Sequence, residues 1–291
     1  MNLKSLLITL TLFVCGQAVA TDNTVHSIDT TEFNVTIYGE GQPILLIPGL
    51  SSSASVWDDT VAALKHDYQL HVLQLAGFAG KPALPGELLQ QGFVSTQTTA
   101  IYQYILANDL VDPVLVGHSL GGFIAMKLAL AHPDHIAGVV NVDSLPALGA
   151  LFGSFEDGSS EQGTAENAPA AFDPYAMAAS MSNNSAWHER IVADMFRSDG
   201  MTSGQVMGEL MMADLRDDLA NLRVPMLTLG ALQNGAPYAQ SEQVQQNYET
   251  QFASVPPHLH TLAYAEDARH FIMADAPEWL VSMIQSFMAE L

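Results

Sequence analysis

Cysteine and basic residues are scarce in this chain of 291 residues. A single cysteine, Cys15, permits no internal disulfide, so stability must come from a hydrophobic core. Only 9 lysines and arginines stand against 31 aspartates and glutamates, which gives a formal net charge of −22. With so few cations to neutralise phosphates, we expect no nucleic-acid partner and no binding to anionic lipid surfaces. Metal-binding patterns are also missing, because the 10 histidines are scattered and no H-E-x-x-H occurs, so we expect no metal and no cofactor.

What the chain has in quantity is apolar residues. They make up 48% of the sequence, enough for a sizeable core and too many for a disordered chain. The length suits one large domain with an inserted element, or two small domains.

The first twenty residues have the pattern of a secretory signal. Lys4 is followed by an apolar run from Leu6 to Val14, and Ala18-Val19-Ala20 fits a small-x-small cleavage site. The run is short for a membrane span, although an N-terminal anchor is the alternative. We therefore predict a signal peptide over residues 1–20, a periplasmic or secreted protein, and no stable membrane association after cleavage.

Strand-like and helix-like segments alternate along most of the chain. Short apolar runs bounded by Pro and Gly predict strands, and apolar residues at helical spacing predict helices. Parallel strands joined by helices form a sheet that is covered on both faces, so the predicted class is α/β with a mostly parallel sheet. The predicted strands are Phe33–Tyr38, Pro43–Ile47, Leu70–Leu75, Pro113–Val116, Ala137–Val142, Pro225–Leu229 and His258–Ala263, and the predicted helices are Ala54–Lys65, Thr96–Asn108, Leu120–Ala131 and Pro277–Leu291.

The alternation breaks between about Leu145 and Val224, where helical patches rich in Met, Ala and Phe occur. We interpret residues 146–223 as a helical insertion over the carboxyl edge of the sheet, between two parts of a core domain at 21–145 and 224–291. Methionine is adaptable and suits a pliant apolar pocket. The alternative, that these methionines only fill a core, stays open.

Gly117-His118-Ser119-Leu120-Gly121 matches the pattern G-x-S-x-G. An apolar strand precedes it and a helix follows, as in a nucleophile elbow. A turn this tight imposes strained dihedral angles on Ser119 and lifts its hydroxyl to a helix N-terminus, where the dipole favours a developing anion. The alternative is a glycine-rich turn with a buried capping serine.

A serine hydroxyl needs a base within hydrogen-bond reach. His270 follows the last predicted strand and precedes the terminal helix, so it lies at the same sheet edge as Ser119. His118 is adjacent to the serine, but neighbouring side chains on such a turn diverge. Position therefore favours His270 as the general base.

Taken together, the chain resembles the α/β-hydrolase superfamily, in a branch of esterase- and peptidase-like serine hydrolases with a cap between strands six and seven. The resemblance runs from about Phe33 to the C-terminus. Its carriers are Ile47-Pro48-Gly49-Leu50, Gly77-Phe78-Ala79-Gly80, Gly117–Gly122, Val142-Asp143-Ser144, Val224-Pro225-Met226 and His270-Phe271.

The resemblance implies a third catalytic residue and an oxyanion hole. The family's commonest acid lies about three residues past Gly230, where this chain has Gln233 and Asn234. A known variation places the acid after strand six, at Asp143, which we predict to orient the imidazole and stabilise its cation. Asn234 and Asp267 are the alternatives. The implied oxyanion donors are the backbone amides of Leu50 and Leu120.

The predicted reaction is acyl transfer through Ser119 on a small to medium hydrophobic ester, a small-molecule substrate. Amide, lactone, thioester and C–C substrates stay open. Because the usual acid is missing after strand seven, a non-catalytic binding protein with this fold is the alternative from another class.

Overall fold

The computed structural model describes residues 26–152, 172–235 and 239–291. The predicted signal peptide, and residues 153–171 of the predicted insertion, lie outside these residues.

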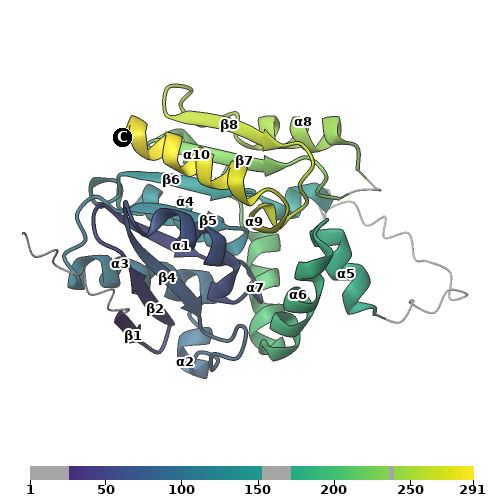
Figure 1. Ribbon diagram of the computed structural model, residues 1–291, viewed down its shortest axis with the longest axis horizontal. Helices are drawn as coiled ribbons and strands as arrows, with labels where there is room; N and C mark the ends of the chain where they lie inside the picture. The colour runs from purple at the N-terminus through teal and green to yellow at the C-terminus, as the bar shows by residue number, and fades with distance from the viewer. Residues whose placement is uncertain (1–25, 153–171, 236–238) are drawn as a thin grey trace, which may run out of the picture.

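One eight-stranded sheet forms the centre of the molecule, in the order β1-β2-β4-β3-β5-β6-β7-β8 (Figure 1). From β4 to β8 neighbouring strands run parallel, while β2 is antiparallel to both β1 and β4. The mostly parallel α/β sheet predicted from the sequence is thus confirmed. The strands are β1 (His26–Asp29), β2 (Phe33–Tyr38), β3 (Pro43–Ile47), β4 (Gln69–Leu75), β5 (Val114–His118), β6 (Gly138–Val142), β7 (Met226–Ala231) and β8 (His260–Ala265).

Helices cover both faces of this sheet because its central strands are apolar on both sides. In β3, Leu45 and Ile47 belong to one buried cluster, and Ile44 and Leu46 belong to the other. The first cluster includes α3 (Phe93–Ala107), α4 (Leu120–Ala131) and α8 (Ser241–Gln251), and the second includes α1 (Asp58–Leu64) and α10 (Pro277–Glu290). Burial on two faces explains why every residue of β3, β5 and β6 is buried and why apolar residues do not alternate with exposed polar ones in these strands.

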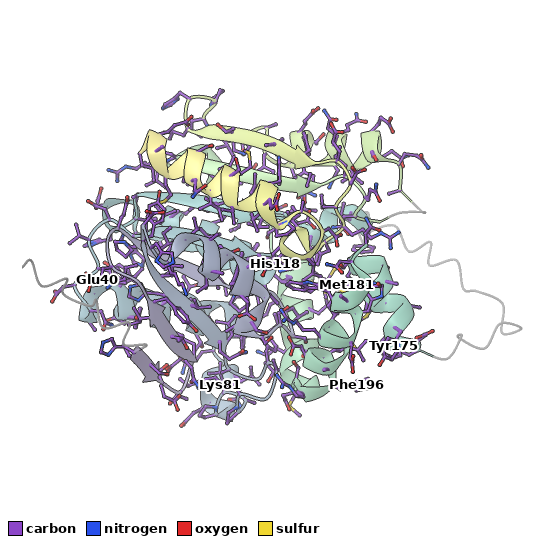
Figure 2. All side chains as sticks on the ribbon, viewed as in Figure 1. Glu40, Lys81, His118, Tyr175, Met181 and Phe196 are labelled. Carbon is purple, nitrogen blue, oxygen red and sulfur yellow. The ribbon has the colours of Figure 1, made fainter. Side chains whose placement is uncertain are left out.

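Three helices are inserted between β6 and β7: α5 (Pro174–Met181), α6 (Ser185–Arg197) and α7 (Gly200–Met212). They gather at one end of the molecule (Figure 1), and Tyr175 and Phe196 project from them in Figure 2. Ala178, Ile191 and Val192 pack into one core cluster, whereas Val206 and Leu210 pack into the other. The inserted helices therefore contact both core clusters.

Short elements complete the chain. They are the helices α2 (Gly86–Leu89) and α9 (Ile272–Asp275), and the 3-10 turns η1 (Ala54–Trp57), η2 (Pro133–His135), η3 (Leu148–Phe152) and η4 (Asp218–Asn221). In the part of the chain that the structure describes, no helix combines the length and the apolar character of a bilayer-crossing segment.

Candidate active site

Ser119 occupies the sharp turn between β5 and α4. Its φ of 53° is a left-handed conformation that side chains rarely adopt, and it marks stored backbone strain. The Ser119 amide donates to the carbonyl oxygen of Val142 at 3.0 Å, so the turn is tied to the end of β6. Ser119 is only half-buried, and its hydroxyl lies at the start of α4.

Glycines on both sides of the serine are required by space. A Cβ at position 117 would lie 2.2 Å from the Gly121 carbonyl oxygen, and one at position 121 would lie 2.2 Å from the Ile47 carbonyl oxygen. Both values are far below van der Waals contact, so only glycine lets α4 approach β3 and β5 this closely. The predicted strand-turn-helix context of G-x-S-x-G is what the structure contains.

His270 and Asp143 are joined by a short hydrogen bond. The imidazole Nδ1 lies 2.6 Å from Asp143 Oδ2, and the aspartate side chain is fully buried while that of His270 is 19% exposed. Donation from Nδ1 leaves Nε2 as the nitrogen available to take a proton from a nucleophile. Segments 127 residues apart in the chain are thus brought together, in the pairing that the sequence predicted.

The Asp143 carboxylate accepts hydrogen bonds from four groups. Besides His270, the Ala231 amide donates to Oδ1 at 2.8 Å, the Tyr248 hydroxyl to Oδ1 at 2.7 Å, and Asn234 Nδ2 to Oδ2 at 2.8 Å. Burial, and then the negative charge of Asp143, hold the pKa of Tyr248 well above its usual value, so the phenol stays a donor. Four donors compensate the loss of hydration of this buried charge.

The two alternatives for the acid are placed differently. Asn234 donates to Asp143 instead of contacting the imidazole, so it supports the carboxylate. Asp267 is exposed, and its Oδ1 accepts a long hydrogen bond of 3.5 Å from Gln233. Tyr248 had no sequence signal: it lies on α8, a polar helix that the apolar spacing did not predict.

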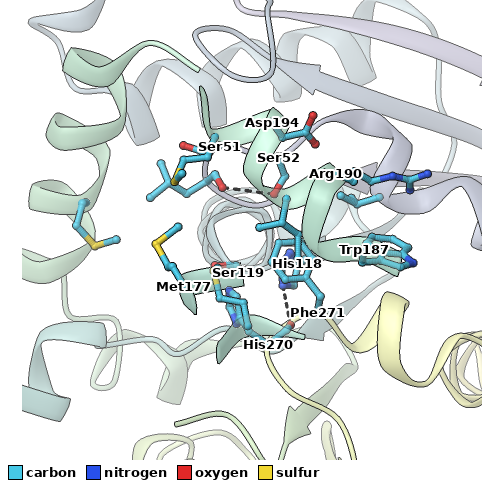
Figure 3. A pocket seen from close by; sticks show the side chains of 16 residues that line it. Ser51, Ser52, His118, Ser119, Met177, Trp187, Arg190, Asp194, His270 and Phe271 are labelled. Carbon is cyan, nitrogen blue, oxygen red and sulfur yellow. Dashed lines mark hydrogen bonds between the residues drawn. The ribbon is translucent and has the colours of Figure 1, made fainter. Parts of the chain in front are cut away.

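His118 holds the loop that carries His270. Its Nε2 donates to the His270 carbonyl oxygen at 2.9 Å, drawn as the dashed line below His118 in Figure 3. The centroids of the two imidazole rings are 4.6 Å apart. Burial, and then the charge of His270, lower the pKa of His118 well below its usual value near 6.5. His118 is therefore a neutral donor beside the candidate base.

The two residues predicted to supply oxyanion donors, Leu50 and Leu120, both lie close to Ser119. Leu50 follows β3 in a loop against the serine, since a Cβ on the preceding Gly49 would lie 3.2 Å from Ser119 Cβ. Leu120 begins α4. Within the described residues, neither amide donates to a protein acceptor, so both stay available to a ligand.

Ser119 and His270 both line a cavity of about 260 Å³. Its other walls come from the loop after β3 and from the inserted helices, with Met177 and Trp187 on opposite sides in Figure 3. No hydrogen bond joins the Ser119 hydroxyl to His270 among the described residues; in many enzymes this bond tightens only when substrate binds. Nor do the described residues contain a group of three or more His, Cys, Asp or Glu that could hold a metal ion.

Comparison with known proteins agrees with this fold. The model of the alpha/beta hydrolase family matches residues 44–283. Pimeloyl-[acyl-carrier protein] methyl ester esterase of Vibrio cholerae is 30% identical over 204 residues, which are 66% of this chain and 76% of that protein. The counterpart from Pectobacterium carotovorum is 27% identical over 206 residues, 67% of this chain and 77% of that one.

Solved structures are similar in fold. A thermophilic esterase from Thermogutta terrifontis superposes with a TM-score of 0.67 at 18% identity, covering 91% of this chain and 98% of that one. An enol-lactonase from Burkholderia xenovorans gives a TM-score of 0.67 at 16% identity, covering 88% and 96%. A sheet of this kind that carries a serine at a strand-turn-helix elbow, a histidine and a buried acid is typical of the alpha/beta hydrolases. The chain belongs to the alpha/beta hydrolase family.

Proposed function

We propose that this protein is a serine hydrolase that cleaves small to medium apolar carboxylic esters. The observation that supports this most directly is the arrangement at the edge of the sheet: a strained, accessible serine and a histidine fixed by a buried carboxylate line one apolar cavity. At about 260 Å³, this cavity is near the lower end of ligand-site volumes.

In the proposed cycle, the Ser119 hydroxyl attacks the ester carbonyl carbon while His270 Nε2 takes its proton. The Leu50 and Leu120 amides donate to the oxyanion that forms. His270 then protonates the leaving alcohol, and the carbon–oxygen bond of the ester breaks. Water repeats the sequence on the acyl-enzyme, releasing the acid and restoring Ser119. Asp143 stabilises the imidazolium and fixes its tautomer.

The substrate class rests on the cavity lining and on the curated relatives. Met177, Met181, Ile191 and Phe271 give the lining an apolar character, and the two curated relatives compared above, 30% and 27% identical, are named as methyl ester esterases. Esters are therefore favoured over the amides, lactones and C–C compounds that the sequence left open. The inserted helices would act as the cap over this site.

Export is part of the proposal and rests on the pattern of residues 1–20 alone. Cleavage after Ala20 would give a mature chain that begins at Thr21, and the mass of the protein recovered outside the cytoplasm would check it.

Ser119→Ala separates the hydrolase from a non-catalytic binding protein. We expect the wild-type protein to react with a fluorophosphonate probe and to hydrolyse p-nitrophenyl butyrate. Removing the nucleophile should abolish labelling and lower kcat by about 10⁶-fold, as for other triad serines. Ser95→Ala, at an exposed serine on α3 away from the cavity that Ser119 lines, is the matched control and should keep the label. A wild-type protein that takes up no label and cleaves no ester in a panel of rising acyl length would contradict the proposal.

A further inference from the structure

Two separate cavities meet at the candidate catalytic pair. The first, called here the large chamber, is the cavity of about 260 Å³ that runs from Ser119 and His270 towards α5 and α6. The second, called the small chamber, has a volume of about 90 Å³ and is also lined by Ser119 and His270. Its remaining walls are Leu120, Asp143, Ser144, Leu145, Leu148, Leu151, Leu210, Asn234 and Tyr248.

The two volumes set different limits on what each chamber accepts. The small chamber has about a third of the volume of the large chamber. An ester with one short and one long arm therefore suits the two chambers better than an ester whose two arms are of equal length.

The walls differ in how far they can yield. Leucines line much of the small chamber, and two of its polar residues, Asn234 and Tyr248, donate to Asp143. Moving these two residues would take hydrogen-bond donors away from a buried charge. The large chamber is lined by Met177, Met181 and Met195, which repack at low cost.

We propose that the site selects unsymmetrical esters, with a short arm in the small chamber and a longer apolar arm in the large chamber. This inference rests on the proposed ester hydrolysis at Ser119. An ester carbonyl at the serine has one arm on each side of the reacting carbon, and Ser119 and His270 line both chambers.

Isomeric esters test the proposal without changing the hydrophobicity of the substrate. Ethyl heptanoate, heptyl acetate and butyl pentanoate have the same composition, and only the position of the ester group differs. We expect kcat/KM for the better of the first two to exceed that for butyl pentanoate by at least about tenfold, a difference of about 1.4 kcal/mol. Whichever isomer is preferred also identifies the arm, acyl or alkoxy, that enters the small chamber. Equal values, or a preference for butyl pentanoate, would overturn the proposal.

Enlarging each chamber in turn assigns the preference to its wall. Leu148→Ala widens the small chamber and should raise the rate on butyl pentanoate, relative to the preferred isomer, by about fivefold or more. Met177→Ala is the matched control in the large chamber and should leave that ratio within about twofold. An unchanged ratio in Leu148→Ala, or an equal change in both variants, contradicts the inference.

The fluorophosphonate label distinguishes the two levels of failure. A protein labelled at Ser119 that shows no preference among the isomers is a serine hydrolase without the proposed selectivity. A protein that takes no label and cleaves none of the three esters overturns both the proposed function and this inference.

Discussion

The carboxyl edge of the sheet and the inserted helices face each other across one cavity, and they are built in opposite ways. At the edge, Ser119 and Asp143 both have positive φ, and the buried carboxylate has four donors. On the helices, by contrast, Phe196, Met201 and Met212 are 69%, 77% and 84% exposed. Most of the exposed large apolar side chains in the described residues lie between Leu151 and Met212.

This difference separates chemistry from selection. Proton transfer needs fixed distances, which strained turns and saturated hydrogen bonds supply. Substrate shape is accommodated by side chains that repack, which methionines supply. Changes at the edge should therefore affect kcat or folding strongly, whereas changes on the helices should affect substrate preference or stability mildly.

The largest expected effect comes from moving the acid between two neighbouring positions at the edge. His270 Nδ1 and Asn234 Nδ2 both reach Asp143 Oδ2, at 2.6 and 2.8 Å. Asp143→Asn should lower kcat by about 10⁴-fold, because an amide cannot stabilise the imidazolium or fix its tautomer. Adding Asn234→Asp places a carboxylate next to position 143, the position that the imidazole contacts, and should restore at least about 100-fold of the loss. Steady-state kinetics on one p-nitrophenyl ester would measure both.

Asp267→Asn is the control for this exchange. Its carboxylate is exposed and contacts Gln233, so activity should stay within about twofold of wild type. If Asp143→Asn kept near-full activity while Asp267→Asn lost it, the acid would be misassigned.

The strands and the core of the site were predictable because their signals are local. The bounds of β2 and β3 match the prediction residue for residue, since proline or glycine punctuates short apolar runs there. The sequence singled out Ser119 and His270 as candidates because a tight turn demands glycines and because strand order places both residues at one edge of the sheet. The predicted helix Ala54–Lys65 instead begins as the 3-10 turn η1, and β8 lies two residues later than predicted.

What the sequence could not provide is the support around the acid. Tyr248 belongs to α8, whose sequence SEQVQQNYETQ offers two apolar residues for an amphipathic pattern, Val244 and Tyr248. The sequence indicated Asn234 only as a possible replacement for the acid, because the sequence alone does not show that Asn234 and Asp143 are hydrogen-bonded to each other. Such contacts depend on tertiary packing between segments about 90 residues apart.

The second comparison is between glycines, one at the edge and one on the inserted helices. Gly121→Ala would place a Cβ 2.2 Å from a backbone oxygen, which should lower the free energy of unfolding by at least about 3 kcal/mol. Gly208 lies in the interior of α7 with open space around its Cα, so Gly208→Ala should raise the free energy of unfolding by about 0.5–1 kcal/mol. Urea denaturation measures both, and a Gly208→Ala variant less stable than wild type would show that α7 is as constrained as the edge.

The smallest expected effect at the edge concerns His118, which acts on the candidate base through its backbone. His118→Phe keeps a ring against Phe271, whose centroid is 5.0 Å away, but loses the donor to the His270 carbonyl oxygen. A buried acceptor left without its hydrogen-bond partner costs about 1–3 kcal/mol. The His270 loop can relieve this cost by moving the carbonyl oxygen towards water, which displaces the imidazole, so kcat should fall about 10- to 100-fold. KM should change little, because the chamber walls are kept.

His118→Gln distinguishes positioning from packing. The glutamine amide nitrogen has a reach similar to that of the imidazole Nε2, so it can donate to the same carbonyl and should recover much of the kcat that the phenylalanine variant loses. Because the pKa of wild-type His118 is well below its usual value, the histidine is a neutral donor, and the amide, which does not titrate, reproduces that state at every working pH. The kcat–pH profile of His118→Gln should therefore keep the wild-type shape. If both variants lost the same fraction of kcat and of thermal stability, His118 would be only a packing residue. The positioning of His270 would then depend on the hydrogen bonds around Asp143 alone.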